Sequence, residues 1–151
     1  MLEYPDQEED AHRKGQTMQL EPYIFFYGQC EEALDFYKGA LGGTYEVTRF
    51  EGSPMADQVP ADARNKIMHA SFKGDGFSFM ASDGDLSKKL DPDAGNVSLS
   101  LGISDRAQAE RAFNALAQGG KVAQPLSDAF WGGRFGMVVD RFGTEWMVTS
   151  D

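Results

Sequence analysis

The stretch FWGGRFGMVVDRFG, residues 130–143, decides the fold of this chain. A loop with two aromatic residues and an arginine leads into an apolar strand, predicted over residues 135–140. Arg141-Phe142-Gly143 follows as a tight turn, in which glycine tolerates positive φ. The stretch therefore predicts the edge of a small sheet, and an aromatic loop there indicates a ligand site.

Two amphipathic helices lie upstream, and they look like copies of each other. Their apolar stripes, at helical spacing, are Cys30, Ala33, Leu34, Tyr37 and Leu41 in the first and Ala109, Ala112, Phe113, Leu116 and Ala117 in the second. Asp105 is the expected N-cap of the second helix. Each helix ends at a glycine pair, Gly42-Gly43 or Gly119-Gly120.

The surrounding segments repeat as well, in the order strand, helix and three strands. The expected strands are residues 23–27, 44–51, 66–72 and 77–82, then 97–103, 121–126, 135–140 and 144–149. We predict an α+β fold in which two βαβββ modules form a curved, cupped mixed sheet. The single domain covers residues 18–151, with module 1 at 18–83, a linker at 84–95 and module 2 at 96–151.

Composition excludes several classes of function. The apolar runs of this 151-residue chain are far shorter than the roughly 20 residues that span a bilayer, so no membrane partner is expected. The net charge of -10 and the lack of a Lys/Arg cluster argue against nucleic acid. The single cysteine, Cys30, excludes an intrachain disulfide and fits a cytoplasmic protein. We expect it to be a small buried hydrophobic residue.

Residues 1–17 form an acidic segment without the apolar centre of a secretory signal. We predict a disordered N-terminal extension. Whether the natural start is Met1 or Met18 stays open.

Strand alternation predicts which side chains line a cavity. The helix side takes Met68, Ala70, Phe72, Phe77, Phe79 and Ala81 from two strands of module 1, and Ile67, His69, Ser71, Ser78, Met80 and Ser82 face the other way. The predicted cavity is lined by Ile24, Phe26, His69, Met80, Ser98, Ser100 and Met147. It is mostly apolar with a few polar groups, which suits a small organic ligand.

The aromatic loop and His69 each have two possible roles. Phe130 and Trp131 would clamp an apolar ligand and Arg134 would hold its carboxylate or phosphonate, or this loop is a dimer interface. His69 is the candidate general base, or a structural histidine bonded across the sheet. Asp83 and Asp140 are expected to be solvated caps, and Glu145 to be exposed.

Several of these motifs resemble one known family. They are Pro22-Tyr23, Gly28 to Ala33, Phe36-Tyr37, Leu41-Gly42-Gly43, Met68-His69-Ala70, Gly119 to Val122 and Phe130-Trp131-Gly132 with Arg134-Phe135-Gly136. In this order they resemble the PhnB-like subfamily of the glyoxalase/bleomycin-resistance/dioxygenase (vicinal-oxygen-chelate) superfamily. The resemblance implies paired βαβββ modules around a cupped site, often in a homodimer.

Metal-using members of that superfamily bind a divalent metal through His, Gln or Glu on the first and last strand of each module. Those positions fall at or beside Pro22, Met80, Ser98 and Met147, none of which is a good metal ligand. We therefore expect no metal and no other cofactor. Some relatives are labelled as ubiquinone-type methyltransferases, but this sequence lacks the glycine-rich strand-to-helix loop of a doubly wound cofactor fold.

The sequence thus predicts a PhnB-like protein that binds a small molecule in an apolar cup without metal. Two alternatives stay open. One is a metal-dependent lyase or dioxygenase with a divergent site built from His69, Glu21 or Glu145, and the other is a dimeric interaction module. Whether the protein is an enzyme is not decided by the sequence.

Overall fold

The computed structural model describes residues 18–93 and 95–151, so the predicted extension, residues 1–17, lies outside the described residues. The elements in chain order are β1 (Tyr23–Phe25), α2 (Cys30–Leu41), β2 (Thr44–Arg49), the 3₁₀ turns η1 (Ala56–Gln58) and η2 (Ala61–Ala63), β3 (Ile67–Gly74), β4 (Phe77–Ser82), β5 (Ser98–Gly102), α3 (Arg106–Ala117), β6 (Lys121–Asp128), β7 (Arg134–Val139) and β8 (Glu145–Ser150). No helix in these ranges is long and apolar enough to cross a membrane.

The strands form two four-stranded mixed sheets with the same topology. The first has the order β1, β4, β3, β2 and the second β5, β8, β7, β6. In each, the strand before the helix pairs in parallel with the last strand of its module, and the other pairs are antiparallel. The predicted α+β fold of two βαβββ modules is confirmed.

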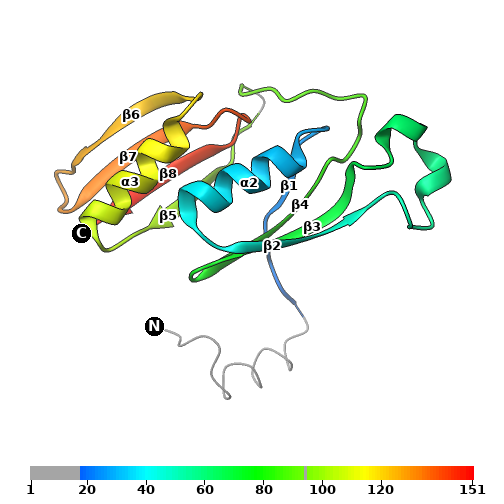
Figure 1. The fold of residues 1–151 in the computed structure, drawn as a ribbon. Helices are drawn as coiled ribbons and strands as arrows, with labels where there is room; N and C mark the ends of the chain where they lie inside the picture. Colours follow the sequence, from blue (N-terminus) through cyan, green and yellow to red (C-terminus); the bar gives the residue numbers. More distant parts are fainter. Residues whose placement is uncertain (1–17, 94) are drawn as a thin grey trace, which may run out of the picture.

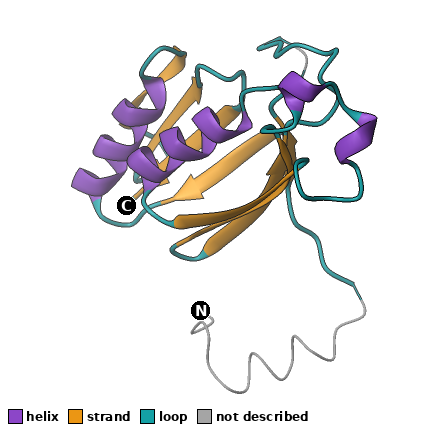
Figure 2. Cartoon of the chain, turned by 45° about the vertical axis from the view of Figure 1, so that its right-hand side comes forward, coloured by secondary structure: helices purple, strands orange, loops and turns teal. Residues whose placement is uncertain are grey.

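The two helices lie side by side, each against its own sheet (Figures 1 and 2). Both bury the predicted apolar stripe, and Asp105 caps α3 as expected, since its side chain accepts hydrogen bonds from the N–H groups of Ala107 and Gln108. At α2 the preceding residue, Gln29, makes no side-chain cap. Asp83, from the end of β4, accepts from the N–H of Cys30 instead.

The glycine pairs allow each helix to turn into its next strand. The first glycine of each pair, Gly42 or Gly119, has positive φ, 74° and 75° respectively. The second packs against backbone: a Cβ on Gly43 would lie 2.5 Å from the Lys73 carbonyl oxygen, and one on Gly120 would lie 2.3 Å from that of Val139. Only glycine leaves room for the backbones to approach this closely.

One hydrophobic core joins the helix sides of both modules, and a buried carboxylate lies within it. Asp140 is 3% exposed. Its Oδ2 accepts from the Tyr37 hydroxyl at 2.6 Å and from Trp146 Nε1 at 2.8 Å, and its Oδ1 accepts from the N–H groups of Phe142 and Thr144. The expectation of a solvated cap was wrong, because donors from both modules replace water around this group.

Burial together with the nearby Asp140 charge raises the pKa of Tyr37 well above its usual value. The tyrosine therefore stays protonated and keeps donating its hydrogen bond. Phe142 packs beside it, within 6.2 Å of the Tyr37 ring and 6.0 Å of the Phe26 ring. The contact between α2 and the β7 to β8 turn is thus both polar and aromatic.

The predicted alternation holds for most strands but was wrong at two places in module 1. Ile67 was expected opposite the helix and is fully buried in the core. A bulge causes this, since Arg49 pairs with Ile67 and Thr48 with His69, which leaves Met68 out of the ladder. Ala70, Phe72, Phe79 and Ala81 face the helix as predicted.

The second error lies in β1. Phe26 is 0% exposed and Ile24 packs against the core, whereas both were expected in the cavity. Ile24 pairs with Ala81, and Phe26 follows the strand with its N–H bonded to the Ser82 carbonyl. Tyr23 and Phe25 take the other face.

We predict that Asp140→Asn lowers the free energy of unfolding by about 3 kcal/mol, because an amide NH₂ group would oppose donors that now meet a carboxylate. Urea unfolding followed by circular dichroism measures this change. Asp128→Asn is the matched control, since the Asp128 side chain is exposed and forms a surface ion pair with Arg106. Its effect should stay below about 1 kcal/mol. Equal effects of the two substitutions would contradict the proposed role of Asp140.

Candidate functional site

The side of each sheet that faces away from its helix is the candidate site. In the second sheet, strand register fixes the members of this side, because paired residues point the same way. Ser98, Glu145 and Val139 form one row, Ser100, Met147 and Met137 the next, and Gly102, Thr149 and Phe135 the third. We call these nine residues the open face of the second sheet. The predicted positions of Ser98, Ser100 and Met147 on one face are confirmed by this register.

A serine and a carboxylate meet at one end of this face. The Ser98 hydroxyl donates a hydrogen bond to Glu145 Oε1, and the pair is partly buried. Glu145 is therefore less exposed than its place beside a turn suggested. The next row is apolar, with Met137 and Met147 paired directly across the strands.

The aromatic loop borders the opposite end of the face. Trp131 is 63% exposed and its ring lies 5.9 Å from that of Phe135, in an edge-on arrangement. Phe130 is 96% exposed and contacts Trp131. Trp131 thus extends the apolar surface of the open face, while Phe130 points into solvent.

Arg134 lies on the helix side of the second sheet. It donates to the Leu126 carbonyl at 3.1 Å and approaches Glu110 of α3 at 3.8 Å. Strand β7 begins at Arg134, and alternation along the strand sets its side chain on the same side as Gly136 and Val138. The contact of Arg134 with a ligand carboxylate stays a prediction.

The first sheet has its own uncovered side, which the register also defines. It carries Tyr23 and Phe25 from β1, His69 and Ser71 from β3, and Ser78 and Met80 from β4. The Tyr23 hydroxyl lies 3.3 Å from His69 Nδ1, and Tyr23 pairs with Met80. We call these six residues the open face of the first sheet.

Of the predicted ligand residues, Ser98, Ser100 and Met147 share one open face, and His69 and Met80 share the other. Sequence reasoning missed five members of these faces: Phe135, Met137, Val139, Tyr23 and Phe25. The first three had a usable signal, since they alternate with Gly136 and Val138 along an evident strand. Tyr23 and Phe25 had none, because every residue from 23 to 27 is apolar or aromatic.

The superfamily's metal positions do not fit a divalent cation in this chain. Met80, Ser98 and Met147 stand on the open faces where ligands would be needed, and thioether and hydroxyl groups bind such ions poorly. In residues 18–93 and 95–151, no three His, Cys, Asp or Glu side chains come together as a metal site would require. We derive no chemistry through a metal.

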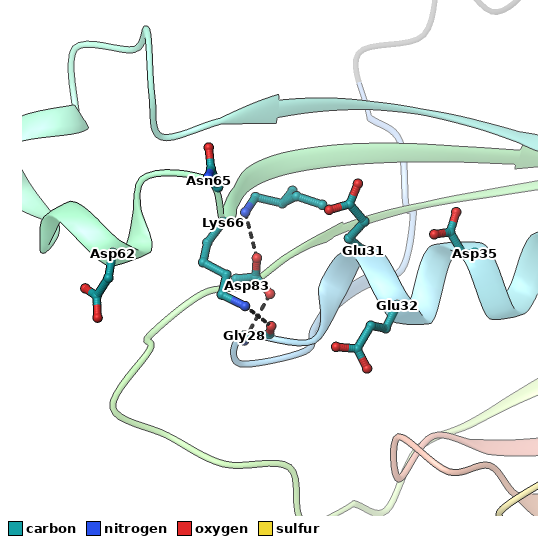
Figure 3. A pocket seen from close by; sticks show the side chains of 9 residues that line it. Gly28, Glu31, Glu32, Asp35, Asp62, Asn65, Lys66 and Asp83 are labelled. Atoms are coloured by element: carbon teal, nitrogen blue, oxygen red, sulfur yellow. Dashed lines mark hydrogen bonds between the residues drawn. The ribbon is translucent and has the colours of Figure 1, made fainter.

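A hollow of about 480 Å³ lies elsewhere, at the start of α2. Figure 3 shows its acidic rim, with Glu31, Glu32 and Asp35 from α2 and Asp62 across from them. Asp83 fills its base. The Asp83 carboxylate accepts from the N–H groups of Gly28, Cys30 and Ile67, at 3.0, 2.8 and 2.6 Å.

Asp83 is 1% exposed, so the expectation of a solvated cap was wrong here too. A helix N-terminus attracts anions through its free N–H groups. Here the Asp83 carboxylate occupies the position that an anion would take. Lys66 lies beside it and donates to the Gly28 carbonyl at 2.8 Å. The start of α2 is therefore occupied by the chain itself.

A second hollow, also about 480 Å³, lies between the modules. Its lining includes Leu41, Phe77, Ser100 and Arg111. Of the predicted ligand residues, Ser100 alone contributes to it.

Cys30 is fully buried at the start of α2, as predicted. Burial, with the charges of Asp83 and Glu31 adding to it, raises the pKa of the thiol to about 12. The thiolate is the reactive form of cysteine, so this residue is protected by both burial and protonation.

The fold with these open faces is that of the glyoxalase/bleomycin resistance/dioxygenase superfamily, which solved members share. Residues 18–149 match the family described as 3-demethylubiquinone-9 3-methyltransferase, and the chain belongs to this PhnB-like family. Protein YjdN of Escherichia coli strain K12 is 31% identical over 143 residues, which cover 87% of this chain and 94% of YjdN.

Two solved structures are similar over most of the chain. Protein PA1353 from Pseudomonas aeruginosa is 44% identical with a TM-score of 0.76, and the match covers 89% of this chain and 98% of that one. The PhnB protein from Bacillus cereus shares the fold at 22% identity, with a TM-score of 0.72 and coverage of 89% and 100%. The family resemblance expected from the motifs is confirmed.

We predict that Cys30 does not react with iodoacetamide in the folded protein at pH 8, because the thiol is buried and protonated. Mass spectrometry of the labelled protein gives the number of modified thiols. The same treatment in 6 M guanidinium chloride should modify one thiol per chain, which controls for reagent quality. Labelling of the folded protein at the rate of an unfolded thiol would contradict the burial described here.

Proposed function

We propose that this protein binds a small, partly apolar organic molecule on the open face of the second sheet. The observation that carries the proposal is the composition of that face, where Met137, Met147 and Phe135 lie beside Ser98, Ser100 and Glu145. Apolar walls with a few convergent polar groups are typical of small-molecule sites. Methionine adapts to ligands of irregular shape, and Trp131 adds an aromatic surface at the edge.

We further propose that a second copy of the chain covers this face and completes the cup. The helix sides of both modules share one core, so the two open faces are turned away from it and are not covered by described parts of the same chain. Phe25 is 48% exposed on the face of the first sheet. An uncovered surface with aromatic residues is a usual sign of an interface. The family's frequent dimers agree with this proposal.

Methyl transfer, the activity in the family's description, is not part of the proposal. A doubly wound fold would hold its cofactor at a free helix N-terminus. Here Asp83 accepts the Gly28 and Cys30 N–H groups. Ligand capture needs no such site, and it needs no nucleophile.

The proposed binding can be tested with Nile red, a neutral apolar dye whose emission rises and shifts to the blue when it leaves water. We predict saturable binding to the native protein and at least a tenfold loss of affinity in Met147→Lys. An ammonium group on the apolar row would have to be desolvated when the dye binds. Fluorescence titration measures both affinities.

Asn114→Lys is the matched control, since it adds the same charge at an exposed position of α3. Its affinity for the dye should equal that of the native protein, and circular dichroism should confirm that both variants are folded. The proposal fails if the native protein does not bind the dye, or if both lysine variants bind it equally.

Mixing two defective variants tests the shared cup. We predict that Met80→Lys, on the first sheet, also abolishes dye binding, because its face closes the partner's site. After the two variants are unfolded together and refolded, mixed dimers should contain one intact cup each. About a quarter of the native binding capacity should then return. A Met80→Lys variant that binds normally, or a chain that sediments as a monomer, would show that a single open face is the whole site.

A further inference from the structure

Glu145 is the single carboxylate on the open face of the second sheet. It pairs with Ser98 on one side and with Val139 on the other, and Met147 follows it on the same face of β8. Lys121 continues this row on the outer strand β6, but Val139 separates the two charged residues. No arginine or lysine of the described residues lies within ion-pair distance of Glu145.

Glu145 has one hydrogen-bond donor within the described part of the chain. The Ser98 hydroxyl donates to Oε1, and no protein group there donates to Oε2. A carboxylate can accept about four hydrogen bonds. A partly buried carboxylate without a nearby cation is unfavourable because it has lost part of its hydration. A ligand that brings N–H donors and positive charge would offset this desolvation free energy.

The neighbouring residues indicate the rest of the ligand. Glu145 and Met147 are two residues apart on one strand, so their side chains emerge about 7 Å apart. Beyond Met147 and Met137 come Phe135 and the Trp131 ring. Thioethers and aromatic rings pack well against a flat apolar group.

We propose that the site selects organic amines, in which an ammonium group at Glu145 is joined by a short linker to an aromatic body on the Met137 and Met147 row. This inference rests on the proposed function, since it names the class of ligand for the same face. It adds the specificity residue: Glu145 accepts the ammonium hydrogen bonds, and Ser98 holds the carboxylate in place.

Three ligands that share a naphthyl group and a two-carbon linker test the inference by isothermal titration calorimetry in 0.15 M NaCl. They are 2-(2-naphthyl)ethylamine, the alcohol 2-(2-naphthyl)ethanol and the acid 3-(2-naphthyl)propionate. We expect the amine to bind about tenfold more tightly than the alcohol, and the acid to bind most weakly. In Glu145→Gln the affinity for the amine should fall to the affinity for the alcohol. The affinity for the alcohol itself should change less than about twofold.

Glu110→Gln separates this contact from the general attraction of an acidic protein for cations. Glu110 lies on α3, on the far side of the sheet, and its removal changes the net charge equally. It should leave the preference for the amine intact. A preference that survives in Glu145→Gln, or that is lost in both variants, would overturn the inference.

If the amine has no advantage in the native protein, the inference fails while binding of the alcohol would still support the proposed function. If none of the three ligands binds, the inference is overturned, and the dye titration decides the proposed function separately.

Discussion

The buried carboxylate of Asp140 links the two modules of the chain. It is the point where α2 of the first module meets the β7 to β8 turn of the second, through Tyr37 and Trp146. Removing a charge from water is unfavourable, and four hydrogen bonds offset that cost here. The directional bonds add a constraint that apolar contacts lack, because they hold the helix of one module at a fixed distance from the other sheet.

That link decides which surfaces are left for function. Since the helix sides of both modules are used in the shared core, the opposite sides of the two sheets remain uncovered. The face of the second sheet combines methionine, aromatic and serine side chains with one carboxylate, and the face of the first carries Tyr23 and His69. Two charged groups away from these faces, Asp83 and Arg134, are already bonded to the protein's own backbone. The open faces are therefore the surfaces to which we assign the proposed ligand and partner.

Much of the fold could be predicted from the sequence, because the helices, the glycine pairs and the repeat depend on local periodicity. The faces of β5 and β8 followed from clear alternation. Two kinds of feature could not be predicted. Residues 23–27 are all apolar or aromatic, so alternation assigned Ile24 and Phe26 to the wrong side, and the bulge beside Met68 reversed Ile67 without any local signal. Asp83 and Asp140 look like turn residues, and their burial depends on donors that come from distant segments.

A crystal structure of the protein as purified from cells would show whether a small molecule occupies the open face. We predict electron density for a small organic molecule against Met137 and Met147, with the face of the first sheet from a second copy covering it. An ammonium nitrogen of that molecule should lie within hydrogen-bonding distance of Glu145. A molecule bound instead in the hollow at the start of α2, or an open face packed directly against protein with no space for a ligand, would contradict the account.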